Sequence, residues 1–393
     1  MRVHVLLATL GALAAASSLP SLVAAPAAPL RKVQDLVVYA DPAYHCAFPS
    51  VVRRADGELL LAFRRAPNRL LLSEGRNSHV DPNSFLVSVR SRDGGLTWSP
   101  EPTLLYADAW GGAQDPCLLQ LRDGELLCFS YGWTFVRPDG LEKLKQPVHQ
   151  NLFGSVFNGG FYVRSADGGR AWSGPFRPPH ITPQILLDPR GQPIPAYNRG
   201  ALAEGRDGRI FWAVAATEAI KPSRTAVHLI TSSDRGATWT YASPIATDPQ
   251  VVFNEASILE TPRGDLVTFL RTDKLNGDAA IARSTDGGKS FSPWRRLNFH
   301  AVPLHGLRLR DGRVLLTYGH RKAPLGVRAR LLNPECTDIE AAPEFVIRDD
   351  GATVDLGYSW SVQLDDTRVL VAYYMNTPGT PLPHIAASIL EIN

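Results

Sequence analysis

The same ten-residue pattern occurs four times along this chain, and it constrains the fold more than any other feature. It stands at 91–100 as SRDGGLTWSP, and again at 165–174, 232–241 and 284–293 as SADGGRAWSG, SSDRGATWTY and STDGGKSFSP. Aspartate and glycine favour a tight turn in which the carboxylate accepts backbone N–H bonds, and the aromatic ring can pack between neighbouring sheets. The pattern therefore predicts a structural turn between two outer strands. A degraded fifth copy, LLNPECTDIE, stands at 331–340.

A second repeat consists of two apolar runs around a polar turn rich in Asp and Gly, which is typical of a β-hairpin. It occurs six times, at 48–65, 116–131, 200–215, 256–271, 304–319 and 360–374. Six hairpins, each followed by another strand pair, give six four-stranded units of about 60 residues, which is the signature of a β-propeller. Six separate domains are excluded, because a lone unit of this size buries too little surface.

The expected fold is therefore an all-β, six-bladed β-propeller that spans residues 34–393. We call the repeated ten-residue turn pattern the Asp-box. The chain begins, after its first thirty residues, with QDLVVYADPAY and ends with PHIAASILEIN, and both segments have the pattern of a strand. A last blade that takes strands from both ends of the chain would close the ring and leave no free edge.

The first thirty residues differ in composition from the remainder. They hold one arginine near the start, then an apolar run, then alanines around residues 25–28. This predicts a signal peptide over residues 1–28 and a periplasmic or secreted protein without stable membrane insertion, with a retained anchor as the alternative. The net charge of the 393 residues is only +3, without a long Lys/Arg run, so nucleic acid is not an expected partner.

The four cysteines form no CxxC pair, so neither a zinc site nor a redox motif is expected, and no metal or cofactor is predicted. Cys117 and Cys128 are expected to face each other across the second hairpin. Export would allow a disulfide between them, and buried thiols are the slightly favoured alternative.

The open ends of the six hairpins should meet at one mouth if the first strand of each blade lines the axis. Ionisable and aromatic residues recur at these ends. A single charged residue at a strand end is explained by its contact with solvent, but the convergence of the whole set on one mouth is not. The candidates are Ala47, Phe48, Arg64, Asp115, Tyr131, Arg199, Asn254, Glu255, Arg271, His300, His320, Arg321, Tyr358, Tyr373 and Tyr374.

Asp-boxes spread over six blades resemble the sialidase superfamily across residues 34–393. NEASILETPRGDLVTFLRTD at 254–273 is similar to the segment in which a Glu opens a strand and an Arg closes the hairpin, which implies Glu255 and Arg271. LGYSWSVQLDDTRVLVAYY at 356–374 is similar to the segment that carries the nucleophilic Tyr, which implies Tyr358. GVRARLL at 326–332 implies another carboxylate-binding arginine, Arg328 or else Arg330.

The resemblance implies a mechanism and a proton donor. Sialic acid carries a carboxylate on its anomeric carbon, so arginines bind it and a Tyr assisted by a Glu replaces a carboxylate nucleophile. The acid that protonates the leaving oxygen is implied on the loop before the first Asp-box, at Asp81 or His79. Asp115 and Tyr131 are further candidates for binding the glycan.

The chain departs from the family at its first hairpin. CAFPS has Ala47 where sialidases have the first of three arginines, and Arg64 across the hairpin is the candidate substitute. We therefore expect an exo-acting glycoside hydrolase for a terminal sialic acid or a related acidic sugar. The alternatives are a propeller lyase or hydrolase acting on polysaccharide that contains uronic acid or rhamnose, and a non-catalytic glycan-binding propeller.

Overall fold

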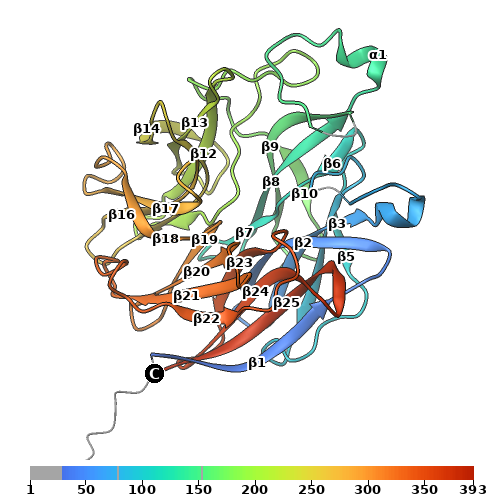
Figure 1. The fold of residues 1–393 in the computed structure, drawn as a ribbon. Helices are drawn as coiled ribbons and strands as arrows, with labels where there is room; N and C mark the ends of the chain where they lie inside the picture. Colours follow the sequence, from blue (N-terminus) through green and yellow to red (C-terminus); the bar gives the residue numbers. More distant parts are fainter. Residues whose placement is uncertain (1–28, 78, 152–153) are drawn as a thin grey trace, which may run out of the picture.

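Six small antiparallel sheets surround one axis in the computed structural model, as Figure 1 shows. The structure describes residues 29–77, 79–151 and 154–393, so the expected signal peptide at 1–28 lies outside the described residues. The predicted all-β, six-bladed propeller is confirmed. Among the described residues, two short helical turns, η1 (Arg69–Leu72) and α1 (Pro138–Leu141), lie in connections.

The blades follow one another along the chain. Blade 1 holds β2 (Tyr44–Arg53), β3 (Leu59–Pro67), β4 (Phe85–Ser91) and β5 (Thr103–Tyr106). Blade 2 holds β6 (Gly111–Ala113), β7 (Cys117–Gln120), β8 (Leu126–Phe135), β9 (Ser155–Ser165) and β10 (Ser173–Phe176), with β6 and β7 both paired to β8. Blade 3 holds β11 (Ala203–Glu204), β12 (Ile210–Ala219), β13 (Arg224–Ser232) and β14 (Thr240–Ala246).

The second half repeats this arrangement. Blade 4 holds β15 (Val252–Glu260), β16 (Leu266–Asp273), β17 (Asp278–Ser284) and β18 (Arg295–His300). Blade 5 holds β19 (Leu304–Arg308), β20 (Val314–His320), β21 (Gly326–Leu332) and β22 (Phe345–Arg348). Blade 6 holds β23 (Gly357–Gln363), β24 (Arg368–Thr377), β25 (Thr380–Ile392) and, from the other end of the chain, β1 (Leu30–Tyr39).

The ring closes through strands from both ends of the chain, as predicted. β1 pairs antiparallel with β25, from Leu30 opposite Ile392 to Tyr39 opposite Ile385 (Figure 1). This pairing covers an edge that blade 6 would otherwise expose.

The six hairpins supply the inner strands. β2 contacts both β7 and β23, and β19 contacts both β15 and β23, so first strands of neighbouring blades meet around the axis. Apolar side chains fill the space between blades, as where the rings of Phe129 on β8 and Trp212 on β12 lie 4.7 Å apart. Helices contribute nothing to this core, and no helix in the described part of the chain is both long and apolar enough to span a membrane.

The Asp-box turns connect the third and fourth strands of their blades, as predicted. Asp93 accepts hydrogen bonds from the backbone N–H of Thr97 at 2.9 Å and from its hydroxyl at 2.6 Å. Asp234 and Asp286 repeat both bonds with the residue four positions on. Gly95 adopts φ +90°, and a Cβ there would lie 2.3 Å from Leu370 of blade 6, so the turn packs directly on the neighbouring blade.

The expected positions of Cys117 and Cys128 are wrong by one residue. Cys117 pairs with Phe129 and Leu118 pairs with Cys128, so the two cysteines occupy opposite faces of the sheet. Successive side chains on a strand alternate between faces. All four cysteines are buried free thiols.

Candidate functional site

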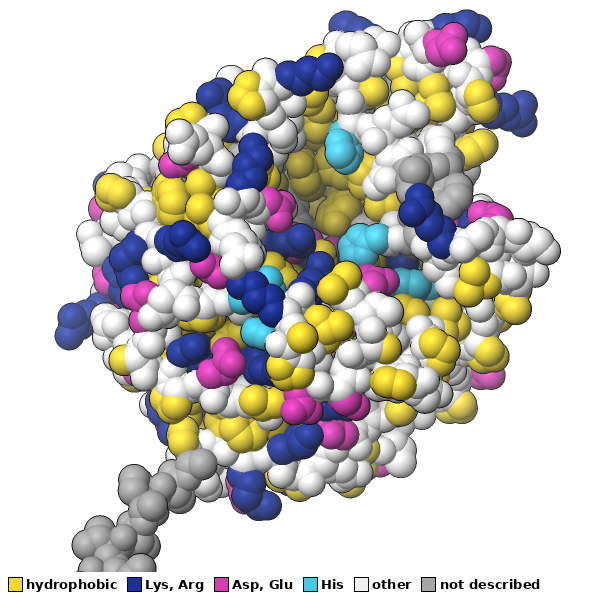
Figure 2. Space-filling view, viewed as in Figure 1, with side chains coloured by type: hydrophobic (Ala, Val, Ile, Leu, Met, Phe, Trp, Pro, Cys, Tyr) yellow, Lys and Arg dark blue, Asp and Glu magenta, His cyan; other side chains and the backbone are white. Residues whose placement is uncertain are grey.

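Irregularities in the inner strands direct side chains into the mouth of the propeller. The register is interrupted between Ala47 and Ser50 on β2, between Phe253 and Ala256 on β15, and between Gly357 and Trp360 on β23. Phe48 and Tyr358 adopt φ of 60° and 49°, a left-handed conformation that is unfavourable for bulky residues. Such strain is concentrated at functional sites in proteins. Figure 2 shows histidine, basic and acidic side chains gathered around a hollow in this face.

Tyr358, Glu255 and Arg271 meet in this mouth. The Tyr358 hydroxyl donates to Oε1 of Glu255 at 2.5 Å, and Nη1 of Arg271 donates to Oε2 of Glu255 at 2.5 Å and to the Tyr358 hydroxyl at 3.2 Å. Glu255 and Arg271 stand on β15 and β16 of blade 4, and Tyr358 stands on β23 of blade 6. The structure thus brings together the three residues for which the sialidase resemblance implied a nucleophile, its base and a carboxylate-binding arginine.

The environment separates the pKa values of the acid and the phenol. Burial opposes ionisation of Glu255, but Arg271 and the hydrogen bond from Tyr358 outweigh it and hold the pKa of Glu255 below its ordinary value. Burial, with the Glu255 carboxylate next in effect, raises the pKa of Tyr358 well above 10. Near neutral pH the pair is therefore a neutral phenol beside a carboxylate that can accept its proton.

Two further arginines flank the tyrosine. The guanidinium carbon of Arg321 lies 5.4 Å from the centre of the Tyr358 ring, and its Nε and Nη2 donate to the backbone oxygen of Leu356. Arg199 is buried beneath the site, where it donates to the backbone oxygens of Pro49 at 3.0 Å and Tyr358 at 3.4 Å. Arg321 follows β20 at the end of the fifth hairpin, which is one of the positions that were predicted to face the mouth.

Arg328 does not join this group. It lies on β21, the third strand of blade 5, and its side chain is only 4% exposed. Its Nη1 donates to the backbone oxygens of Val327 and Arg348, and its Nη2 to that of Pro324. Arg330 donates to the hydroxyl of Tyr318 and to the backbone oxygen of Ala342. Arg321 is thus the arginine of blade 5 that the structure places beside Tyr358.

Arg64 is close to the mouth but enclosed. It pairs with Ala47 across blade 1, as expected, but it is 0% exposed because Phe48 covers it, with 5.0 Å between the Arg64 guanidinium and the Phe48 ring. It donates to the backbone oxygen of His79 at 2.5 Å and faces Nδ1 of His45 at 3.0 Å. Arg64 thus lies beneath Phe48, bonded to His45 and to the backbone of the His79 loop, and is not exposed at the mouth where a substitute for the missing arginine was expected.

The two candidate proton donors have different surroundings. Asp81 is 1% exposed, and both of its carboxylate oxygens accept from Arg69 at 2.7 Å. His79 is 42% exposed, its ring centre lies 5.9 Å from that of Tyr358, and its Nδ1 lies 3.1 Å from Oδ1 of Asp355. The structure therefore places His79, but not the Asp81 carboxylate, at the open mouth.

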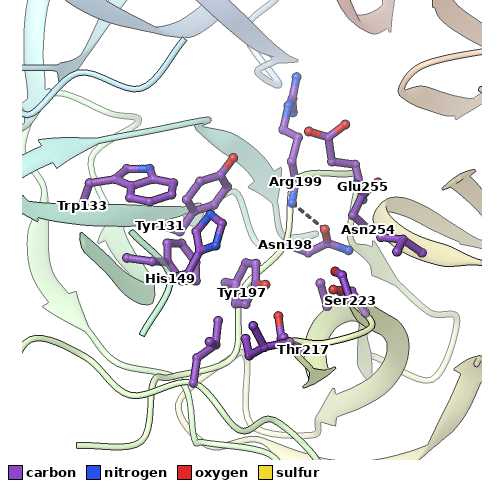
Figure 3. A pocket seen from close by; sticks show the side chains of 16 residues that line it. Tyr131, Trp133, His149, Tyr197, Asn198, Arg199, Thr217, Ser223, Asn254 and Glu255 are labelled. Carbon is purple, nitrogen blue, oxygen red and sulfur yellow. Dashed lines mark hydrogen bonds between the residues drawn. The ribbon is translucent and has the colours of Figure 1, made fainter. Parts of the chain in front are cut away.

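A cleft of about 470 Å³ extends from Glu255 between blades 2, 3 and 4 (Figure 3). Its walls include four aromatic side chains, Tyr131, Trp133, Phe157 and Tyr197, and the neutral polar groups of Asn198 and Thr217. Aromatic faces with a few polar groups are typical of sites for small molecules. Tyr131 could be predicted because it ends a hairpin, whereas Trp133 and Tyr197 lie beyond the hairpin ends and could not.

Asp115 lies behind this cleft. Its side chain is fully buried and accepts a hydrogen bond from the Tyr131 hydroxyl at 3.1 Å, while Oδ1 has no hydrogen-bond partner among the described residues. Burial raises the pKa of Asp115 to about 6 despite the opposing charge of Arg199. The two predicted binding residues are thus in contact with each other.

Asp355 is the functional candidate that the sequence analysis missed. It precedes Tyr358 by three residues, and its carboxylate accepts from His45 at 2.9 Å, His79 at 3.1 Å and the Tyr374 hydroxyl at 2.7 Å. The sequence feature that could have identified Asp355 is an acidic residue just before the inner strand of blade 6.

Comparisons with known proteins agree with this architecture. Residues 87–371 match the model of the BNR repeat-like domain family. A sialidase of Micromonospora viridifaciens is 26% identical over 289 residues, which cover 67% of this chain but only 39% of that protein. This chain therefore spans well under half the length of that curated relative.

Solved structures share the fold. A protein of unknown function from Dyadobacter fermentans is 57% identical, with a TM-score of 0.91 over 93% of this chain and all of that one. A NanB sialidase variant of Streptococcus pneumoniae is 14% identical, with a TM-score of 0.63 over 91% of this chain and 70% of that one. The Hadza microbial sialidase Hz136 is 19% identical, with a TM-score of 0.59 over 88% and 65% of the two chains. On the extent of its family match, its six blades and its four Asp-box turns, the chain belongs to the BNR repeat-like family of the sialidase superfamily.

Proposed function

We propose that this protein is an exo-acting glycoside hydrolase that releases a terminal sialic acid or a related acidic sugar through a covalent intermediate on Tyr358. The observation that carries the proposal is the hydrogen bond of 2.5 Å between the Tyr358 hydroxyl and Glu255, with Arg271 bonded to both residues. A carboxylate nucleophile would be repelled by the substrate's own carboxylate, whereas a neutral phenol would not be.

The chemistry follows from the two pKa shifts. Because the phenol is protonated near neutral pH, it becomes a nucleophile only as its proton passes to Oε1 of Glu255. Arg271 and Arg321 both carry positive charge close to Tyr358, so they stabilise the phenolate character that develops. When the sugar–tyrosine bond later breaks, the same proton returns from Glu255 to Tyr358.

The proposed substrate class rests on the charges around the tyrosine. Arg271 and Arg321 are positioned to bind one carboxylate, since guanidinium groups pair well with carboxylates. Among the described residues that line the cleft beside Glu255, Arg199 is the one arginine or lysine, and it is itself bonded to buried backbone oxygens. We therefore propose a sugar with a single carboxylate near its reacting carbon and neutral substituents on the side that enters the cleft.

A covalent trap tests this proposal. The crystal structure of the Trypanosoma rangeli sialidase with 2,3-difluorosialic acid is described as a covalent intermediate, so the same compound is a suitable probe. Intact mass measurement should show an adduct on the wild-type protein and none on Tyr358→Phe. A wild type that forms no adduct and releases no sugar from acidic aryl glycosides would refute the proposal.

The product distinguishes hydrolysis from the alternatives. A lyase acting on uronic acid would release an unsaturated product that absorbs in the near ultraviolet, and a non-catalytic glycan-binding propeller would bind without turnover. We expect neither result, because a buried, bonded Tyr–Glu–Arg arrangement has no role in simple binding. Either result in place of hydrolysis would overturn the assignment.

We also propose export to the periplasm or the medium, on the basis of the signal-peptide pattern at 1–28. N-terminal sequencing of the product made in a bacterial host should begin between about residue 26 and residue 35. A product that begins at Met1 would contradict export with cleavage.

A further inference from the structure

A chain of hydrogen bonds links the covered Arg64 to the open mouth. Nη2 of Arg64 lies 3.0 Å from Nδ1 of His45, and Nε2 of His45 lies 2.9 Å from Oδ2 of Asp355. Oδ1 of Asp355 lies 3.1 Å from Nδ1 of His79. The four residues come from β3, β2 and the two loops that precede β4 and β23.

The direction of each hydrogen bond follows from the chemistry of the groups. A guanidinium only donates, so Nδ1 of His45 accepts, and Nε2 carries the proton that it donates to Asp355. Burial lowers the pKa of His45, which keeps this ring neutral and preserves that tautomer. Burial opposes ionisation of Asp355, but the hydrogen bonds from His45 and His79 outweigh it and hold the pKa of Asp355 well below its ordinary value.

Asp355 therefore remains a carboxylate and can only accept. It fixes the proton of His79 on Nδ1, and the Tyr374 hydroxyl, 2.7 Å from Oδ1, holds the carboxylate in place. Nε2 of His79 has no hydrogen-bond partner in the described part of the chain. A carboxylate that fixes the tautomer of a histidine whose second nitrogen is free is the arrangement by which histidines serve as general acids and bases.

The position of His79 also suits proton transfer at the sugar. Its ring packs edge-on against Phe48 at 4.7 Å and lies 5.9 Å from the ring centre of Tyr358. The backbone oxygen of His79 accepts from Arg64 at 2.5 Å and from Gln114 at 2.8 Å, so the loop is anchored independently of the imidazole. Asp81, two residues on, is buried in its ion pair with Arg69.

We propose that His79 is the general acid and base of the glycosidase reaction, with Asp355 as the residue that positions it. This inference rests on the proposed function. In the first step Tyr358 bonds to the anomeric carbon, the glycosidic C–O bond breaks, and the leaving oxygen takes the proton of Nε2 from doubly protonated His79. In the second step Nε2 takes a proton from water, the water oxygen bonds to the anomeric carbon, and the sugar–tyrosine bond breaks.

Leaving-group dependence tests the acid. We would compare 4-methylumbelliferyl N-acetylneuraminic acid, whose leaving group needs little protonation, with sialyllactose, whose leaving group needs much. His79→Ala should lower kcat/KM for sialyllactose by about 10²- to 10⁴-fold and change it by less than roughly tenfold for the aryl substrate. An equal loss on both substrates would overturn the assignment of His79.

Matched variants separate the roles. Asp81→Asn, which changes the other acidic candidate on the same loop, should leave the ratio between the two substrates unchanged. Asp355→Asn should reproduce the selective loss of His79→Ala, because an asparagine amide can donate to Nδ1 and favour the wrong tautomer. A selective loss in Asp81→Asn, or its absence in Asp355→Asn, would contradict the proposal.

Two readouts keep this inference distinct from the proposed function. Tyr358→Phe should abolish turnover of both substrates, and its failure to do so would overturn the proposed function while His79 remains testable. Nitrogen-15 NMR of the imidazoles, with the His79 signals assigned by their loss in His79→Gln, should show Nδ1–H and unprotonated Nε2 in neutral His79. An Nε2–H tautomer would overturn the proposal whether or not sialosides are substrates.

Discussion

The hydroxyl of Tyr358 lies 2.5 Å from Oε1 of Glu255, although the two residues are 103 positions apart and belong to blades 6 and 4. Their contact crosses the mouth past blade 5, so it depends on the closure of the whole ring. The chemistry of the site is therefore sensitive to the packing of blades that contribute no residue to the bond.

Glu255 should control the acidic side of the pH profile. It must be deprotonated to accept the phenol proton, so activity is present above its pKa and is lost as the pH falls through it. Because that pKa lies below its ordinary value, the acid limb of kcat/KM assigned to Glu255 should lie at a lower pH than the pKa of an ordinary glutamate. Glu255→Gln should lower kcat by about 10²-fold or more, and steady-state kinetics from pH 3 to 8 checks both statements. Full activity of Glu255→Gln would rule out its role as a base.

Substitution of Arg321 should affect catalysis, whereas substitution of Arg328 should affect stability. Arg321→Ala removes a charge beside Tyr358 and should lower kcat/KM for an acidic sugar by roughly 10- to 100-fold, as for a lost charge-assisted hydrogen bond. Arg328→Ala removes the donor of three hydrogen bonds to backbone oxygens and should instead lower the free energy of unfolding by roughly 2 to 3 kcal/mol. Kinetics and urea unfolding of both variants check this, and the opposite pattern would restore Arg328 as the binding arginine.

Arg64→Ala should not discriminate between acidic and neutral sugars. Arg64 lies beneath Phe48 and is bonded to His45 and to the backbone oxygen of His79, so we expect its loss to act through these two groups. We expect a fall in kcat of about tenfold or more with little change in KM, measured on an acidic and a neutral aryl glycoside if both are turned over. A selective rise in KM for the acidic sugar would instead place Arg64 in contact with the substrate.

Asp115 should make stability depend on pH near its own pKa. Its folded-state pKa of about 6 lies above the unfolded value, so the folded state holds the proton more tightly, and stability falls as the pH rises from about 4 to about 6. Asp115→Asn should remove this loss, which is on the order of 2 to 3 kcal/mol for a shift of about two pKa units. Urea unfolding of both proteins at pH 4.5 and 7.5 gives the comparison. The same difference between variant and wild type at both pH values would contradict the shift.

Substitutions in the Asp-box turns should lower stability without changing catalysis. Asp234→Ala removes acceptors for the backbone and hydroxyl of Thr238, and it should lower the free energy of unfolding by roughly 1 kcal/mol while kcat and KM stay the same. Asp286→Ala in the next blade serves as a replicate. A change in kcat without a change in stability would argue against a structural role.

The sequence allowed the fold and the centre of the site to be predicted because both depend on local, repeated patterns. The turn motifs and hairpins recur with fixed chemistry, and the hairpin ends converge by symmetry, which brought Tyr358, Glu255 and Arg271 together. What could not be predicted depends on contacts across blades. Arg321 and not Arg328 lies beside Tyr358 because of the way the second and third strands of blade 5 pack. Arg64 is buried beneath Phe48, whose backbone conformation is unusual. Asp81 is occupied by Arg69 from η1, a turn that the repeat pattern does not contain.

The pairing of β1 with β25 also determines when the sheet of blade 6 can form during synthesis. β1 precedes every other described strand in the sequence and β25 follows them all, so β1 has no partner from its own sheet until β25 has been made. An unpaired strand edge is open to association with other chains during that interval. Loss of β25 would therefore leave both β1 and β24 with an unpaired edge, even though β2 still contacts β23.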